Sequence, residues 1–182
     1  MNSKHLYAVF ALALAVAACG GDDKSSGGGQ AETISTGPTA PTSGGAGHEQ
    51  ALALVNSVRA QARKCGDQTF AAAPPLVWNQ VLAQIAQAHS QDMATHDYFS
   101  HTGRDGSRPS QRAQAAGYNS TYIGENISAG RATMQAAMDG WLASPGHCAN
   151  IMNPAYKDYG IGAGSSRTSR YGTYHTQVFG RR

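Results

Sequence analysis

The order of the helical and strand-like patterns constrains the fold of this 182-residue chain more than any other feature. Apolar residues recur at three- and four-residue steps in the helical segments, and short segments between turn residues read as strands. The predicted helices are 48–64, a second one that follows Pro75 and reaches about Thr95, 110–116, 133–142 and a single turn at 148–152. The predicted strands are 123–128, 159–165 and 173–179. Because strands and helices do not alternate regularly, we predict an α+β fold with an antiparallel sheet.

The first 18 residues predict an export signal. Lys4 precedes an apolar run, Leu6–Ala18, which is too short to span a bilayer comfortably. The run ends Val16-Ala17-Ala18-Cys19, which resembles the lipobox of bacterial lipoproteins. Cys19 is therefore expected to carry acyl chains that hold the mature protein on a membrane. A plain secretory signal followed by an incidental cysteine is the alternative.

Residues 19–47 predict a flexible tether between this anchor and the folded domain. Nine glycines fall between positions 20 and 47, and Ser, Thr and Pro fill most of the rest, so almost nothing in this segment can be buried. As a random coil, the segment would keep the domain about 30 Å from a bilayer. The folded domain is expected to span residues 48–182.

Two cysteines remain after lipidation of the first, Cys65 and Cys148. An exported protein with an even pair of cysteines most simply forms one disulfide, so we predict Cys65–Cys148. A redox or metal-binding role is the weaker interpretation, because the pair has no CxxC spacing.

Charge and motifs exclude several classes of function. The net charge is only +3 and the basic residues are scattered, so nucleic acid is not an expected partner. The sequence has no GxSxG, HExxH or GxxxxGK motif. The glycines of Gly160–Gly164 lie in a predicted strand, where they favour close packing over a dinucleotide-binding loop.

Glu125 is the most informative polar residue. It is the only glutamate after Gln50, and it lies in an apolar, glycine-flanked segment where a carboxylate needs a partner. His101 and His147 are the available imidazoles, and we expect all three side chains to meet in one pocket that water can reach. The alternative is that Glu125 holds a loop by accepting backbone N–H bonds. His89 faces inward on its helix and is expected to be a hydrogen-bonded core residue rather than a ligand.

Four ordered blocks of the chain look like the bacterial branch of the CAP superfamily, which also holds cysteine-rich secretory proteins, insect-venom antigens and pathogenesis-related plant proteins. The match extends from about His48 to Gly180. Its blocks are Phe99-Ser100-His101-Thr102, Gly124-Glu125-Asn126-Ile127, the segment 140–152 (GWLASPGHCANIM) and Thr176-Gln177-Val178-Phe179-Gly180. The resemblance implies a three-layer α-β-α sandwich with a small antiparallel sheet between helices. In many members it also implies a cleft in which two histidines and two acidic residues can hold a divalent metal.

Carried over position by position, the family's loop histidine matches His101 and its GEN glutamate matches Glu125. The second family acid falls on Ser144, and His147 is expected to serve that corner of the cleft instead. Tyr174 takes the place of the last family histidine, while His175 faces the other side of the strand. The metal tetrad is therefore incomplete, and a weakly bound divalent metal such as zinc is the only cofactor that the resemblance implies.

These observations favour a non-enzymatic or weakly catalytic envelope lipoprotein. Its CAP domain would present a His/Glu cleft to an unidentified envelope or extracellular ligand, in the bacterial periplasm or at the cell surface. One alternative is a metal-assisted, peptidase-like hydrolase, with Glu125 as general base on a water polarised by His101 or His147. A further alternative is lipid or sterol binding between helices.

Overall fold

The structure, a computed structural model, describes residues 43–182. The signal peptide predicted at 1–18 and the predicted lipid attachment site, Cys19, lie outside the described residues. In order, the elements are α1 (Ser43–Arg59), β1 (Arg63–Cys65), β2 (Gln68–Phe70), β3 (Val77–Trp78), α2 (Gln80–His96), α3 (Pro109–Ala115), β4 (Ile123–Ala129), α4 (Met134–Ala143), α5 (Pro145–Met152), β5 (Asp158–Ser165) and β6 (Thr173–Gly180). No helix in the described part of the chain is both long and apolar enough to cross a membrane.

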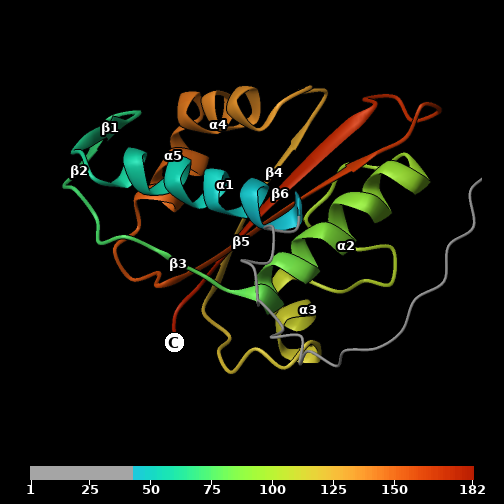
Figure 1. The fold of residues 1–182 in the computed structure, drawn as a ribbon, viewed down its shortest axis with the longest axis horizontal. Helices are drawn as coiled ribbons and strands as arrows, with labels where there is room; N and C mark the ends of the chain where they lie inside the picture. Colours follow the sequence, from blue (N-terminus) through green and yellow to red (C-terminus); the bar gives the residue numbers. More distant parts are fainter. Residues whose placement is uncertain (1–42) are drawn as a thin grey trace, which may run out of the picture. The chain divides into compact units, whose positions relative to one another are not determined.

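A four-stranded sheet forms the middle layer, with the strand order β3-β5-β6-β4. The strands β5, β6 and β4 are antiparallel, whereas the two residues of β3 pair in parallel with β5. The helices α2 and α3 cover one face, and α1, α4 and α5 cover the other (Figure 1). This arrangement confirms the predicted three-layer α+β fold, with one short parallel strand added to the antiparallel sheet.

Glycines on β5 allow α2 to lie directly on the sheet. A Cβ atom at Gly160, Gly162 or Gly164 would overlap backbone atoms of α2. The side chain of Gln87 adds two hydrogen bonds across this contact, donating to the carbonyl of Ala163 at 2.7 Å and accepting from its N–H at 3.1 Å. The Gly160–Gly164 segment therefore serves helix–sheet packing, as predicted.

The first helix differs from its prediction at both ends. It begins at Ser43, so the last residues of the predicted tether, 43–47, are helical. It ends at Arg59 rather than at Lys64, because the Arg59 carbonyl accepts from the N–H of Ala73 at 2.8 Å instead of from a residue four positions on. The Arg59 guanidinium is fully buried and donates to the carbonyls of Pro74, Ile151 and Asn153. Residues 63–65 instead pair with 68–70 as the antiparallel hairpin β1–β2.

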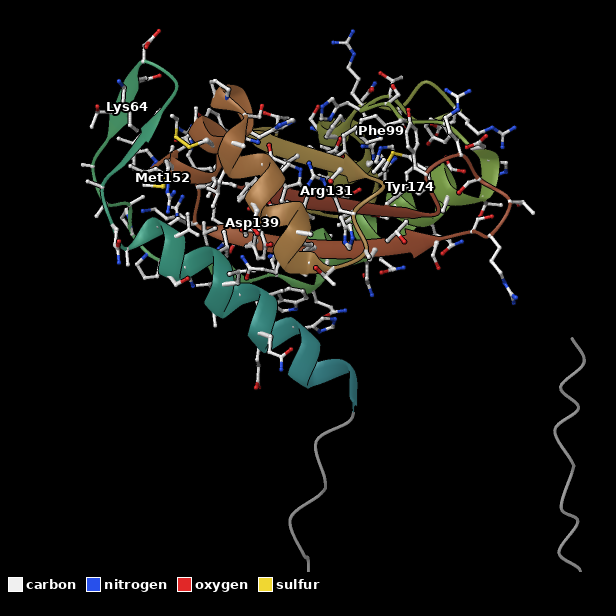
Figure 2. The ribbon with its side chains drawn as sticks, turned by 90° about the horizontal axis from the view of Figure 1, so that it is seen from above. Lys64, Phe99, Arg131, Asp139, Met152 and Tyr174 are labelled. Carbon is white, nitrogen blue, oxygen red and sulfur yellow. A yellow bond between two sulfur atoms is a disulfide. The ribbon has the colours of Figure 1, made fainter. Side chains whose placement is uncertain are left out.

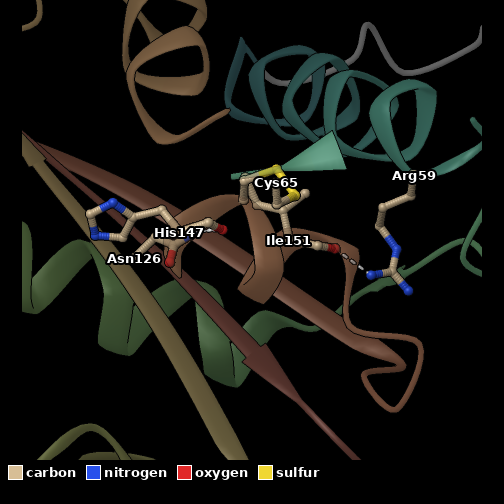
Figure 3. Close-up of a disulfide and its surroundings, with 6 residues drawn as sticks. Arg59, Cys65, Asn126, His147 and Ile151 are labelled. Atoms are coloured by element: carbon tan, nitrogen blue, oxygen red, sulfur yellow. Dashed lines mark hydrogen bonds between the residues drawn. A yellow bond between two sulfur atoms is a disulfide. The ribbon is translucent and has the colours of Figure 1, made fainter. Parts of the chain in front are cut away.

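The disulfide Cys65–Cys148 joins this hairpin to α5, as predicted. Figure 3 shows the disulfide on one side of α5 and the ring of His147 pointing away from it. The same view shows Arg59 reaching the Ile151 carbonyl near the end of the helix. The cross-link and Arg59 together fix α5, the helix that carries His147, against the body of the domain.

Candidate functional site

The candidate site lies at β4, an edge strand of the sheet. The side chains of Tyr156 and Asn150 lie against Gly124 of this strand. A Cβ atom added at Gly124 would overlap the hydroxyl of Tyr156 and the amide oxygen of Asn150. Asn150 in turn donates to the Glu125 carbonyl at 3.2 Å. Gly124 therefore lets the α5 side of the domain close onto the edge of β4.

Glu125 is a buried carboxylate with two side-chain partners. Its side chain is only 2% exposed, and its two oxygens lie 2.7 Å from Nδ1 of His101 and 2.7 Å from an Nη atom of Arg112. A carboxylate paired with a guanidinium only accepts hydrogen bonds, so Nδ1 of His101 carries the donated hydrogen. These partners are side chains, not the backbone N–H groups of the alternative interpretation.

Arg112, on α3, organises this cluster and was missed by sequence reasoning. Besides its bond to Glu125, it donates to the carbonyl of His101 at 3.1 Å and to that of Ser107 at 2.8 Å. One guanidinium thus fixes both the carboxylate and the loop that carries the imidazole. A single arginine in a short predicted helix gives no local signal of this role, because its partner lies 13 residues further along the chain.

Asn126, the last residue of the GEN motif, places His147. Its buried amide donates to the His147 carbonyl at 3.2 Å and to Oε1 of Gln177 at 3.2 Å. It accepts from the amide of Asn150 at 3.0 Å. Because these bonds cross from β4 to the first turn of α5, they hold the start of that helix beside Glu125.

Glu125 and His147 line the same cavity, about 410 Å³ in volume, together with Phe70, Asn126, Gly146, Ala149, Asn150, Asn153 and Pro154. Burial lowers the pKa of His147, and the charge of His101 lowers it further. His101 is half exposed at 50%. It is bonded to Glu125 but is not among the residues that line this cavity. We call the cavity, together with the adjoining His101–Glu125 pair, the edge cleft.

The other predicted positions lie elsewhere. Tyr174 is fully buried between α2 and the sheet, and its hydroxyl donates to Asp97 at 3.3 Å. His175 faces the opposite side of β6, where Nε2 donates to the Arg131 carbonyl at 2.9 Å. His89 is a buried, hydrogen-bonded residue, as predicted, with Nε2 donating to the Ser100 carbonyl at 2.9 Å.

The donor set does not fit a closed zinc site. Zinc sites in proteins use at least three protein ligands, and the described residues contain no group of three His, Cys, Asp or Glu side chains that could hold a metal ion. The Glu125 carboxylate is also engaged at both oxygens, and the guanidinium beside it would repel a cation. Ser144, where the family places its second acid, supplies no charge.

The chain is similar to several bacterial proteins. It is 32% identical over 132 residues to YkwD of Bacillus subtilis, an alignment that covers 72% of this chain and 48% of that protein. It is 33% identical over 104 residues to the B. subtilis membrane protein YlbC, an alignment that covers 57% of this chain and 28% of that protein. The chain thus spans less than half the length of the curated relatives that it matches.

Solved structures show the same fold. An extracellular protein containing an SCP domain from Bacillus anthracis matches with a TM-score of 0.60 and 29% identity, over 81% of this chain and 45% of that one. An outer surface protein of Borrelia burgdorferi matches with a TM-score of 0.57 and 16% identity, over 74% and 88%, and supports the fold alone. The model of the cysteine-rich secretory protein (CAP) family matches residues 52–179. This range contains the GEN motif, α4, and α5, the helix that carries His147. The chain therefore belongs to the cysteine-rich secretory protein (CAP) family.

Proposed function

We propose that this protein is a membrane-anchored lipoprotein of the bacterial envelope whose CAP domain binds an extracytoplasmic ligand through the edge cleft. One observation carries the proposal: the half-exposed imidazole of His101 is held by a carboxylate that is itself buried and ion-paired. A binding group that is fixed before the ligand arrives loses little conformational entropy on binding. The B. anthracis relative, described as an extracellular protein, supports the location.

The hydrogen bond to Glu125 determines what His101 offers. Because Nδ1 carries the donated hydrogen, Nε2 of the neutral ring is an acceptor, and it belongs to a side chain that is half exposed. A protonated ring would present a donor there instead. In the neutral form of His101 the charges of Glu125 and Arg112 balance, so the cleft suits a polar ligand rich in hydroxyl or amide groups.

The same contacts favour binding over hydrolysis. A general base must have a free oxygen within reach of the proton that it removes. Both Glu125 oxygens are engaged, one by the His101 imidazole and the other by the Arg112 guanidinium, so neither is free to take a proton from a water. Glu125 thus acts as the support of His101.

Cell-wall binding tests the cleft. The full chain carrying Cys19→Ser, which cannot be lipidated, is incubated with isolated bacterial cell walls and sedimented. We expect co-sedimentation that is lost with His101→Ala and retained with the matched control His96→Ala, another exposed histidine. Equal sedimentation of both variants, or no sedimentation of the parent chain, would contradict the proposal.

Membrane fractionation tests the anchor separately. The chain with native Cys19 is expected in the membrane fraction, and Cys19→Ser is expected to move it to the soluble fraction. A membrane-bound Cys19→Ser protein would show that acyl chains on Cys19 are not the anchor.

A further inference from the structure

A second cavity adjoins the edge cleft at His147, whose side chain lines both. It measures about 280 Å³ and lies between β4, α4 and the segments around Phe99 and Tyr171. We call it the aromatic cavity. The residues that matter for its chemistry are Phe99, Ser128, Arg131, Ser144, His147 and Tyr171. Two cavities that share one side chain can be occupied by neighbouring units of one extended ligand.

Two exposed aromatic rings flank the aromatic cavity. Phe99 and Tyr171 are 46% and 43% exposed, although they are 72 positions apart and their ring centroids lie 6.1 Å from each other. Tyr171 also packs edge-on against the buried ring of Tyr174 at 6.0 Å, which fixes its orientation. The faces of such rings carry partial negative charge and attract the C–H face of a sugar ring. Isolated exposed aromatics need no explanation, but a touching pair beside a cavity indicates a contact surface.

Arg131 supplies a positive charge at the same place. Its carbonyl accepts from His175, and its guanidinium lies over Gly140 of α4, where an added Cβ would be 3.3 Å from Nη2. A glycine inside a helix lowers stability by about 1 kcal/mol relative to alanine. Here the absence of a side chain at Gly140 leaves room for the Arg131 guanidinium. Within residues 43–182, no carboxylate pairs with Arg131. Because Arg131 is exposed, its guanidinium is accessible to an anion of the ligand.

The edge of β4 argues against a peptide as the extended ligand. A peptide that adds to a sheet bonds to the free backbone groups of the edge strand. Here the Glu125 carbonyl accepts from Asn150 at 3.2 Å, and the Ile127 carbonyl accepts from the Trp141 indole at 2.9 Å. Side chains of the domain therefore already occupy the acceptors that a peptide strand would need.

We propose that the two cavities together bind an anionic glycan, with a sugar ring against Phe99 and Tyr171, a carboxylate of the chain at Arg131, and the next sugar in the edge cleft. This inference rests on the proposed function and names the chemical class of its ligand. A glycan offers flat C–H faces, hydroxyl groups and, in acidic chains, carboxylates at regular intervals. Each of these has a matching group in the aromatic cavity.

Calorimetric titration of the full chain carrying Cys19→Ser tests this proposal with two soluble probes. The first is peptide-free peptidoglycan glycan strands, which bear lactyl carboxylates on alternate sugars, and the second is chitotetraose, which is neutral. We expect the acidic strands to bind about tenfold more tightly. Arg131→Gln should remove this difference in affinity. Phe99→Ala should lower the affinity for both probes about fivefold.

Lys64→Gln is the matched control, because it removes one exposed positive charge far from Phe99 and Arg131 (Figure 2). It should leave both affinities unchanged. Equal affinity for the two probes, or an Arg131→Gln variant that keeps the preference, would overturn the inference. If Arg131→Gln and Phe99→Ala still sediment with cell walls while His101→Ala does not, the proposed function stands and only the glycan inference fails. If the parent chain binds no wall, the proposed function fails with it.

Discussion

Arg112 and Glu125 form an ion pair across the junction of α3 and β4, with 2.7 Å between guanidinium nitrogen and carboxylate oxygen. The arginine side chain is 14% exposed and the carboxylate 2%. A carboxylate so deeply buried is stable only while its charge is compensated. His101 is bonded to the other oxygen of the same carboxylate. The position of the exposed imidazole therefore depends on Arg112, a residue that does not line the cavity of the edge cleft.

The first prediction concerns Arg112→Met. This change leaves the buried carboxylate without its cation and frees the carbonyls of His101 and Ser107, so we expect the free energy of unfolding to fall by about 3 kcal/mol. Urea denaturation measures the loss. Adding Glu125→Gln to the same chain should recover more than half of it, since the unpaired charge is then gone. A single variant as stable as the parent would show that the pair is not a structural support.

The second prediction concerns Gly124→Ala. The new methyl group would overlap the Tyr156 hydroxyl and the Asn150 amide oxygen, so these two side chains must shift and lose the hydrogen bond between them. We expect a loss of about 2 kcal/mol in unfolding free energy and weaker binding of cell walls. The control is Gly47→Ala in α1, outside the edge cleft, where a Cβ meets nothing within 4 Å and the helical backbone suits alanine. Similar losses for the two variants would refute the packing role assigned to Gly124.

Much of the fold could be predicted from local patterns. The apolar stripe of α2 and the capping threonine of α4, Thr133, are local signals, and the structure shows a helix at 80–96 and an N-cap bond from Ala136 to Thr133. The pairing of Cys65 with Cys148 followed from their number alone. His101 and Glu125 could be proposed because a lone carboxylate in an apolar strand needs a partner, and the two residues are indeed 2.7 Å apart.

What could not be predicted depends on contacts between distant segments. The apolar spacing of α1 continues past Arg59, but the helix stops there because the Arg59 carbonyl bonds to the N–H of Ala73, a residue in a distant segment of the chain. Trp78 fits the spacing of the α2 stripe, yet it lies in β3, whose two residues pair with β5. The sequence also gives no signal that Arg131 lies over Gly140, because this contact depends on how α4 packs.

The third prediction concerns the disulfide. Cys65 and Cys148 are 83 residues apart, and opening a loop of this length lowers the stability of the folded state by about 4 kcal/mol in the chain-entropy description. The double variant Cys65→Ser/Cys148→Ser should show this loss in urea denaturation, and the parent chain should show it when a reductant is added. Mass spectrometry after alkylation should find neither residue alkylated in the oxidised parent. Two alkylated cysteines in the untreated protein would refute the cross-link.

The last prediction concerns pH. Burial lowers the pKa of His89, His147 and His175 below the ordinary value near 6.5. Below about pH 6.5 the unfolded chain therefore binds protons at these positions that the folded chain does not bind, so stability must fall as the pH decreases. Each histidine contributes up to about 1.4 kcal/mol per pH unit. Unfolding free energies measured at pH 7.5, 6.5 and 5.5 should decrease in that order, and His175→Gln should make the decrease shallower. A stability that rises on acidification would mean that these imidazoles are charged in the folded domain, contrary to their burial.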